Sequence, residues 1–383
     1  MIGFVAFFGL AAWLYLYFAH SGFWRADQRL PAKPEPVRDW PTVVAIVPAR
    51  NEADSIGAMT TALLAQDYQG ALRIIVVDDA STDGTADLAR ASITGSSPHK
   101  LDVITGQPLV PGWTGKLWAL NSGLRHAEAM PHDYIWFTDA DIVHPPETLT
   151  RLVSKAVNDK RDLVSLMVRL RCVSFWEHRL VPAFIFFFQM LYPFAAANDD
   201  RARTAAAAGG CVLLARGALR NAGGLAVISD RVIDDCALAS IIKRSGGRIW
   251  LGLAGASYSL RAADTLGPLW SMVRRTAFTQ LYYSRALLLG TLMGLGLVFA
   301  GPTLVVLSSP WHQHILATLA GLAAWALMAK AYAPTLRDYG RSPWEGWLLP
   351  FSAALYAAMT VDSAVAHWQR RGGQWKGRHY GPS

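Results

Sequence analysis

The sequence contains little cysteine and little charge. Its three cysteines, Cys172, Cys211 and Cys236, show no CxxC spacing within 383 residues, so the sequence indicates neither a disulfide framework nor a zinc site. Charged residues make up 17% of the chain and hydrophobic residues 52%, a more apolar balance than soluble proteins usually have. We therefore expect part of the chain to lie in a membrane and the rest to face a reducing cytosol.

Clustered basic residues are absent as well. The formal net charge is +8, but the cations are scattered along the chain and form no run interleaved with aromatic residues. Proteins that bind nucleic acid usually concentrate Lys and Arg on one face or in one segment. The sequence thus predicts no nucleic-acid partner, and leaves anionic lipid or a phosphorylated substrate to account for the positive charge.

The N-terminal segment carries no charge up to residue 19, and its length suits one spanning helix of roughly 20 residues. No basic segment precedes it and no small-residue cleavage site follows, so a cleaved signal peptide is disfavoured. We predict a transmembrane helix over residues 1–20. The basic residues that follow place the next part of the chain in the cytoplasm by the positive-inside rule. They are Arg25, Arg29, Lys33 and Arg38.

Residues 41–285 show a different pattern, in which short apolar runs alternate with helical stretches, as expected for an α/β sheet covered by helices. The predicted strands cover residues 43–47, 74–77, 101–104, 134–138 and 163–168. Within this region residues 181–197 are strongly apolar but contain Pro182 and Pro193. We interpret them as a helix in the membrane interface, with a buried core helix as the alternative.

The C-terminal region, residues 286–367, contains three further apolar segments, at about 286–307, 315–333 and 347–367. The first two predict a membrane hairpin across a short uncharged loop. The third contains Pro350 and Asp362 and either spans the membrane or re-enters it, because a full span would put the basic tail of residues 368–383 outside, against the charge rule.

Polar residues follow the first two predicted strands, in the sequences PARNE (48–52) and DDASTDG (78–84). Ligands of open parallel sheets bind beyond the carboxyl ends of the strands. Asp79 is placed to accept hydrogen bonds from a nucleobase and Glu52 to hold the ribose hydroxyls. The alternative is that both residues only cap the helices that follow.

The buried strand at 134–138 leads directly into Asp139-Ala-Asp141. Alternation along an extended backbone points both carboxylates the same way, which provides two hard oxygen ligands for Mg²⁺ or Mn²⁺. Such a metal would also bind a donor diphosphate and neutralise the charge of the leaving group. A lone Asp-x-Asp is often a solvated turn, but its position after a hydrophobic strand favours the metal.

Three more features belong to the candidate site. Lys116 stands in a glycine-containing loop that runs into a helix, where it either forms an ion pair with a phosphate or is simply solvated. Residues 205–210 (AAAAGG) allow either close approach of a ligand to the backbone or close helix packing. Asp234 and Asp235 open a helix and either cap it or provide a base for an attacking hydroxyl.

The ordered motifs PARNE, VVDDASTDG, GKLWALN, DAD and IDDCALA resemble those of family 2 glycosyltransferases of the GT-A fold, over about residues 41–285. The longer strings VSLMVRLRC, FFFQMLYPFA and TAAAAGGC look like the hopanoid-associated glycosyltransferases of that family. The resemblance implies a nucleotide-sugar-binding, Rossmann-like α/β domain flanked by membrane helices, and a hexosyltransferase type of activity. It further implies that Asp79 binds the base, that Asp139 and Asp141 bind the metal and diphosphate, and that Asp235 is the catalytic base of an inverting transfer.

One motif departs from that pattern. Processive relatives carry a Gln/Arg-x-x-Arg-Trp motif after the base, whereas here Trp270 precedes Arg274 and Arg275. The two arginines remain candidates for holding the diphosphate, but the aromatic platform for a growing chain is missing or moved. A single transfer to a lipid therefore fits better than polymerisation.

The expected enzyme is a multi-pass protein of a bacterial-type inner membrane. Its catalytic domain faces the cytoplasm and takes a nucleotide diphosphate sugar, for which we expect a UDP-sugar. The lipid acceptor is a hopanoid by resemblance, with a polyprenyl phosphate or a glycerolipid as alternatives. A catalytically inactive membrane scaffold is the alternative of another class, against which the acidic residues at 79, 139, 141 and 235 argue.

Overall fold

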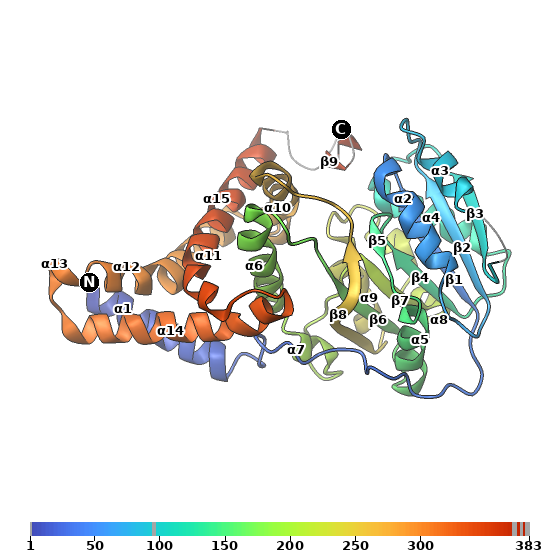
Figure 1. Cartoon of the computed structure of the whole chain (residues 1–383). Coiled ribbons are helices and arrows are strands. Elements are labelled where there is room, and N and C mark those ends of the chain that lie inside the picture. The colour runs from blue at the N-terminus through green and yellow to red at the C-terminus, as the bar shows by residue number, and fades with distance from the viewer. Residues whose placement is uncertain (1, 94–96, 370–373, 376–377, 380–383) are drawn as a thin grey trace.

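The computed structural model describes residues 2–93, 97–369, 374–375 and 378–379. An α/β domain and a helical region lie at opposite ends of the molecule, joined by a helix that packs against both (Figure 1). Most of the predicted basic tail at 368–383 lies outside the described residues.

The α/β domain is built on a mixed sheet of eight strands in the order β3-β2-β1-β4-β7-β6-β8-β5. All five predicted strands are present, at β1 (Val43–Ala49), β2 (Leu72–Asp78), β3 (Lys100–Thr105), β4 (Tyr134–Thr138) and β6 (Leu163–Arg169). The strands β5 (Ile142–Val143), β7 (Cys211–Ala215) and β8 (Ile249–Ser259) were not predicted. β1 to β4 pair in parallel, whereas β7 is antiparallel to both β4 and β6.

Helices cover both faces of this sheet, so its strands are apolar on both sides. α2 (Ala53–Leu64), α3 (Thr85–Ala91) and α5 (Thr148–Asn158) pack on the face that contains Val43 and Ala45. α4 (Gly115–Ala127), α8 (Arg216–Asn221) and α9 (Asp234–Arg244) pack on the face that contains Val44 and Ile46, together with the 3₁₀ turn η1 (Leu225–Ile228). The expected α/β fold is confirmed, and the loops at the carboxyl ends of β1, β2 and β4 are left free for a site.

The joining helix α6 runs over Phe175–Leu191 and is followed by α7 (Phe194–Asn198). It begins earlier than predicted, at a capping box between Ser174 and Glu177, and it continues through Pro182, so only Pro193 interrupts the apolar segment. Val181 packs with the α/β domain and Phe186 with the apolar helices. This packing is that of a buried helix; a location in the membrane interface stays a prediction.

Three C-terminal helical segments are long and apolar enough to cross a membrane: Arg285–Leu307, Ile315–Asp338 and Pro343–Trp368. The first consists of α11 (Arg285–Leu295), the π-helical turn η2 (Gly296–Ala300) and α12 (Gly301–Leu307). A short helix α13 (Ser309–His312) connects it to α14 (Ile315–Asp338), which forms the predicted hairpin. The ambiguous third segment is a 3₁₀ turn η3 (Pro343–Leu348) that continues into one unbroken helix, α15 (Leu349–Trp368).

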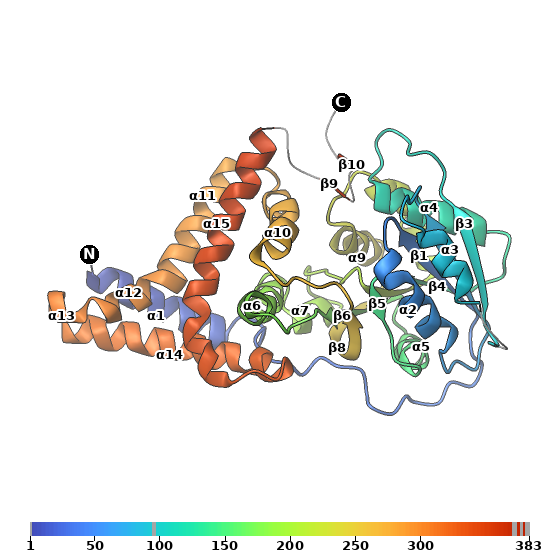
Figure 2. The same cartoon turned by 45° about the horizontal axis from the view of Figure 1, so that its top comes forward.

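The N-terminal helix α1 covers Ile2–Phe18 and is shorter than these three. Its 17 residues rise roughly 26 Å, somewhat less than the roughly 30 Å hydrocarbon core. It lies alongside α12 and α14 (Figures 1 and 2), with Trp13 fully buried. Arg29, in the segment between α1 and the α/β domain, forms an ion pair with Asp338 at the end of α14. The two helices therefore end on the same side, next to the α/β domain.

Candidate active site

A wide cleft lies between the carboxyl ends of the strands and α10 (Leu266–Gln280). It encloses about 1680 Å³, open solvent included. The predicted site residues that line it are Glu52, Lys116, Asp139, Asp141 and Arg275. The sequence motifs thus meet in one place, because the strands that carry them end at one edge of the sheet.

Asp139 and Asp141 enter the cleft from the turn that follows β4. Burial, and then the charge of Asp141, raise the pKa of Asp139, against the opposing effect of Lys116. The end of β4 is fixed behind them by Thr138, which bonds His144 at 2.8 Å and donates to the carbonyl of Gly210. Burial lowers the pKa of His144 to about 3, so this network is neutral and holds the acids without competing for their charge.

Lys116 lies between two acidic groups of the site. It stands in the first turn of α4, whose N-cap is Thr114, and its Nζ is 2.8 Å from Asp139 Oδ1 and 3.5 Å from Asp234 Oδ2. Burial alone would lower the pKa of Lys116, but Asp139 and Asp234 raise it well above its usual value. Lys116 therefore carries a permanent positive charge at the cleft.

Arg261 was not predicted as a site residue, yet it joins two that were. Its Nη2 donates to Glu52 Oε1 at 2.8 Å and its Nε to Asp141 Oδ2 at 3.2 Å. Ser259 also donates to Asp141 Oδ2, at 2.8 Å. Both residues come from the end of β8, and because that strand was not recognised in the sequence, the polar residues at its end gave no signal.

Asp235 lies in the first turn of α9 beside the small-residue stretch. Its Oδ2 accepts from the Gly209 amide at 2.9 Å and its Oδ1 from the Cys236 amide at 2.7 Å. Burial, and then the charge of Asp234, raise the pKa of Asp235 to about 6. A Cβ on Gly209 would lie 3.1 Å from Lys116 Nζ and 3.5 Å from Asp235 Oδ2, so the glycine keeps space open between cation and carboxylate.

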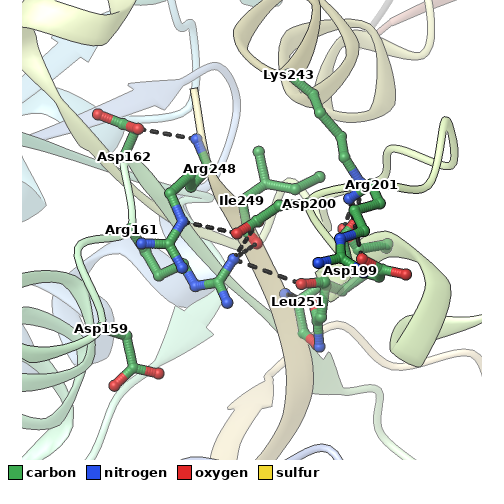
Figure 3. Close-up of polar contacts among 12 residues, drawn as sticks. Asp159, Arg161, Asp162, Asp199, Asp200, Arg201, Lys243, Arg248, Ile249 and Leu251 are labelled. Atoms are coloured by element: carbon green, nitrogen blue, oxygen red, sulfur yellow. Dashed lines mark hydrogen bonds and ion pairs between the residues drawn. The ribbon is translucent and has the colours of Figure 1, made fainter. Parts of the chain in front are cut away.

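The segment that leads to Gly209 also forms hydrogen bonds with the C-terminal end of α9 (Figure 3). Lys243, in the last turn of α9, donates to the carbonyls of Ala197, Asp199 and Thr204 at 2.7–2.8 Å. Arg161 and Arg248 both bind the carboxylate of the adjoining Asp200, at 2.6 Å and 2.7 Å. Residues 197–209 are therefore held against α9, the helix with Asp235 in its first turn, and this fixes the position of the Asp235 carboxylate.

Two predicted donor residues lie outside the cleft lining. Asp79, after β2, is 2% exposed, and its Oδ2 is 3.9 Å from Arg50 Nη1. Arg274 is directed toward α15, where its Nη1 is 3.7 Å from Asp362 Oδ2. The structure thus brings Arg275 to the cleft but not Arg274, because adjacent residues of a helix point in different directions.

Among the described residues, no group of three or more His, Cys, Asp or Glu side chains is placed to hold a metal ion. Asp139 and Asp141 offer two hard oxygen ligands, which suit Mg²⁺ or Mn²⁺ if diphosphate and water supply the others. Their charge is balanced here by Lys116 and Arg261. The donor set therefore fits a divalent cation that arrives with its nucleotide.

Comparison with known proteins gives a family for the α/β domain. Residues 44–223 match the family described as Glycosyl transferase family 2. Two curated relatives are undecaprenyl-phosphate 4-deoxy-4-formamido-L-arabinose transferases. That of Salmonella choleraesuis is 28% identical over 30% of this chain and 33% of its own length, and that of Sodalis glossinidius is 27% identical over 36% and 40%. The chain thus matches between a third and two fifths of the length of these relatives.

A solved structure is similar over almost the whole chain. It is the mannosyltransferase PcManGT from Pyrobaculum calidifontis in complex with GDP-Man and Mn²⁺, which superposes with a TM-score of 0.55. The match covers 96% of this chain and 99% of that one at 21% sequence identity. This likeness shows that the two chains share the same fold.

Proposed function

We propose that this chain, a family 2 glycosyltransferase with a GT-A fold, transfers one sugar from a nucleotide diphosphate sugar to a lipid alcohol at a membrane surface. The observation that carries the proposal is the meeting of Lys116, Asp139 and Asp235 around one space that Gly209 also lines, next to the cleft that contains Asp141. A scaffold without catalysis would have no chemical need for a buried cation between acids beside a carboxylate of raised pKa.

The transfer is an inverting, single displacement. The acceptor oxygen attacks the anomeric carbon opposite the diphosphate, the carbon–oxygen bond to the diphosphate breaks, and the nucleoside diphosphate leaves with the bonding electrons. Asp235 accepts the hydroxyl proton as the new bond forms. Its carboxylate is held by two backbone amides, so it keeps its orientation without a side-chain partner that would compete for the proton.

Donor binding falls to residues that line the cleft. Lys116 would face the diphosphate, and Asp139 and Asp141 would hold a Mg²⁺ or Mn²⁺ ion, which would neutralise the charge of the leaving group. Glu52 would face the ribose, and Asp79, which lies behind the cleft lining, is the residue we propose for the base, for which we expect uracil. Arg275 supplies a further cation at the cleft, while Arg274 keeps α10 against α15.

A lipid acceptor is supported by the three long apolar helices, one of which, α15, packs against the cleft-lining helix α10. The curated relatives are named for transfer to undecaprenyl phosphate, so lipid acceptors occur among similar proteins. We favour an acceptor with a hydroxyl group, of the hopanoid kind suggested by the sequence strings, because a phosphate is already ionised near neutral pH and needs no base.

The direct test is transfer by the purified, full-length protein. We expect one radiolabelled nucleotide sugar of a panel to label a component of membrane lipid extract when Mn²⁺ or Mg²⁺ is present. A labelled product that resists mild acid would identify a glycoside of a hydroxyl, whereas an acid-labile product would identify a sugar phosphate and contradict the lipid alcohol. No lipid labelling from any donor would contradict the proposed transfer.

We also propose that the α/β domain faces the cytoplasm, where sugar nucleotides are made, as the basic residues after α1 indicate. The natural cysteines are poor reporters, since Cys211 and Cys236 are buried. A Cys introduced in place of exposed Asp87 should react with a membrane-impermeant thiol reagent only after cells are opened. One in place of exposed His314, in the loop before α14, should react in intact cells. The reverse pattern would invert the orientation.

A further inference from the structure

A second groove lies on the other side of α9 from the sheet. It encloses about 1350 Å³, open solvent included, between α9, η1 and the end of α10. The α9 residues that line it, Cys236, Ala237, Ser240, Ile241 and Arg244, recur at the spacing of one helix face. Asp235 precedes Cys236 in the chain, but its carboxylate lines the smaller space that contains Lys116 and Gly209, on the sheet side of α9.

The groove is continuous with the donor cleft. Arg231 and Val232 line both spaces, and they belong to the segment between η1 and α9. A molecule that extends along the groove therefore has its inner end at the edge of the donor cleft. Within the groove, Tyr192 accepts a 2.6 Å hydrogen bond from Gln280, and both residues line it.

The outer end of the groove lies where the chain would enter the membrane. Tyr282 and Tyr283 line it, and Arg285, the first residue of the first C-terminal apolar segment, follows closely. Both tyrosines have positive φ values, 50° and 56°, a conformation that costs free energy in residues other than glycine. Tyr283 is fixed by stacking on His367 at 4.3 Å, while Tyr282 remains 77% exposed.

Apolar and aromatic side chains line much of the groove, together with the polar side chains of Ser240, Thr279 and Gln280. Val227 is 55% exposed there. Among the described lining residues none is acidic, and the charged ones are Arg231 and Arg244. The donor cleft, by contrast, contains Glu52 and the aspartates that face the metal. The groove thus lacks the acidic side chains that suit a cation in the donor cleft.

We infer that this groove binds the apolar part of the acceptor, a lipid alcohol that enters past Tyr282 and presents its hydroxyl beside Arg231 to Asp235. The inference rests on the transfer to a lipid proposed above, and it assigns the route and the binding site. It accounts for a groove that begins near a membrane segment and joins the donor cleft at Arg231 and Val232.

The test uses a diazirine-bearing farnesol as a photoactivatable lipid alcohol, with the full-length protein in detergent micelles. Cross-links should map to the segments around Val227–Val232 and Tyr282–Tyr283. Val227→Glu should reduce this labelling roughly tenfold, because a carboxylate against an apolar chain is penalised. Ser240→Trp should do the same by filling the groove. Val157→Glu, a matched exchange at the exposed end of α5, should leave the labelling unchanged.

Kinetics separate this inference from the proposed function. Val227→Glu and Ser240→Trp should raise the KM for acceptor in membrane lipid extract and leave donor binding, measured by calorimetry, unchanged. If both variants transfer sugar at the normal rate and the cross-links map elsewhere, the groove is not the acceptor site. The proposed transfer to a lipid would not be affected by that result. Equal labelling by a diazirine-bearing phosphatidylcholine would overturn the groove as acceptor site too, because the groove would then hold bulk membrane lipid. Specific groove labelling without any transfer would contradict the proposed function alone.

Discussion

Asp235→Asn is expected to lower the transfer rate by about 10²-fold or more while donor binding changes little. Asparagine keeps the size of the side chain and can still accept a hydrogen bond from the Gly209 amide through its carbonyl oxygen. It cannot take up the proton of the attacking hydroxyl. The measurement is single-turnover transfer of labelled sugar, with calorimetric donor binding beside it. Asp87→Asn, an isosteric exchange at a side chain that is 87% exposed, serves as the control.

The pH dependence of the same pair adds an independent readout. Burial and Asp234 raise the pKa of Asp235 to about 6, and a base must be deprotonated to act. The wild-type rate should therefore fall as the pH drops through about 6, and the residual rate of Asp235→Asn should lack this step. A variant that transfers nearly as fast as the wild type, or a product that keeps the donor's α configuration, would exclude Asp235 as the base of a single displacement.

The sequence predicted those strands and site residues that can be recognised from the pattern of neighbouring residues alone. β1, β2 and β4 are continuous apolar runs, and each delivers acidic residues at its end, so both the strands and the acids of the site could be recognised. The sequence also predicted that Lys116 and Asp235 lie near the starts of helices, and the structure has both residues in the first turn of a helix. These features need no knowledge of distant residues.

The rest of the fold depends on contacts between distant segments. β7 and β8 pair with β4 and β6, but β7 follows a run of small residues, and Gly252 and Gly255 within β8 weaken its strand signal. Arg261 donates a hydrogen bond to Glu52, which is 209 positions away in the chain. No local sequence pattern predicts such a contact. Pro182 misled the prediction in the opposite way, because tertiary packing on both sides keeps α6 helical through it.

The ion pairs of Arg261 bear on how the metal binds. In this structure Asp141 Oδ2 accepts from both Ser259 and Arg261, and Asp141 and Glu52 raise the pKa of the guanidinium although its burial opposes this. A divalent ion at Asp141 has to compete with that guanidinium. We therefore expect Mn²⁺ to bind weakly to the protein alone and more tightly together with a nucleoside diphosphate, which adds oxygen ligands and gives Arg261 an anion to bind.

Asp141→Ala is expected to abolish transfer while the protein stays folded, because the diphosphate then lacks its counterion. Mn²⁺ binding, followed by electron paramagnetic resonance in the presence of nucleoside diphosphate, should weaken by at least the roughly 10- to 100-fold that loss of a partner of a metal ligand costs. Arg261→Gln, in contrast, should bind Mn²⁺ more tightly than the wild type without nucleotide, since the competing cation is gone. Asp87→Ala, with circular dichroism for all variants, controls for a general effect of losing a carboxylate. Full activity of Asp141→Ala in the presence of a chelator would show that the two carboxylates after β4 serve no metal.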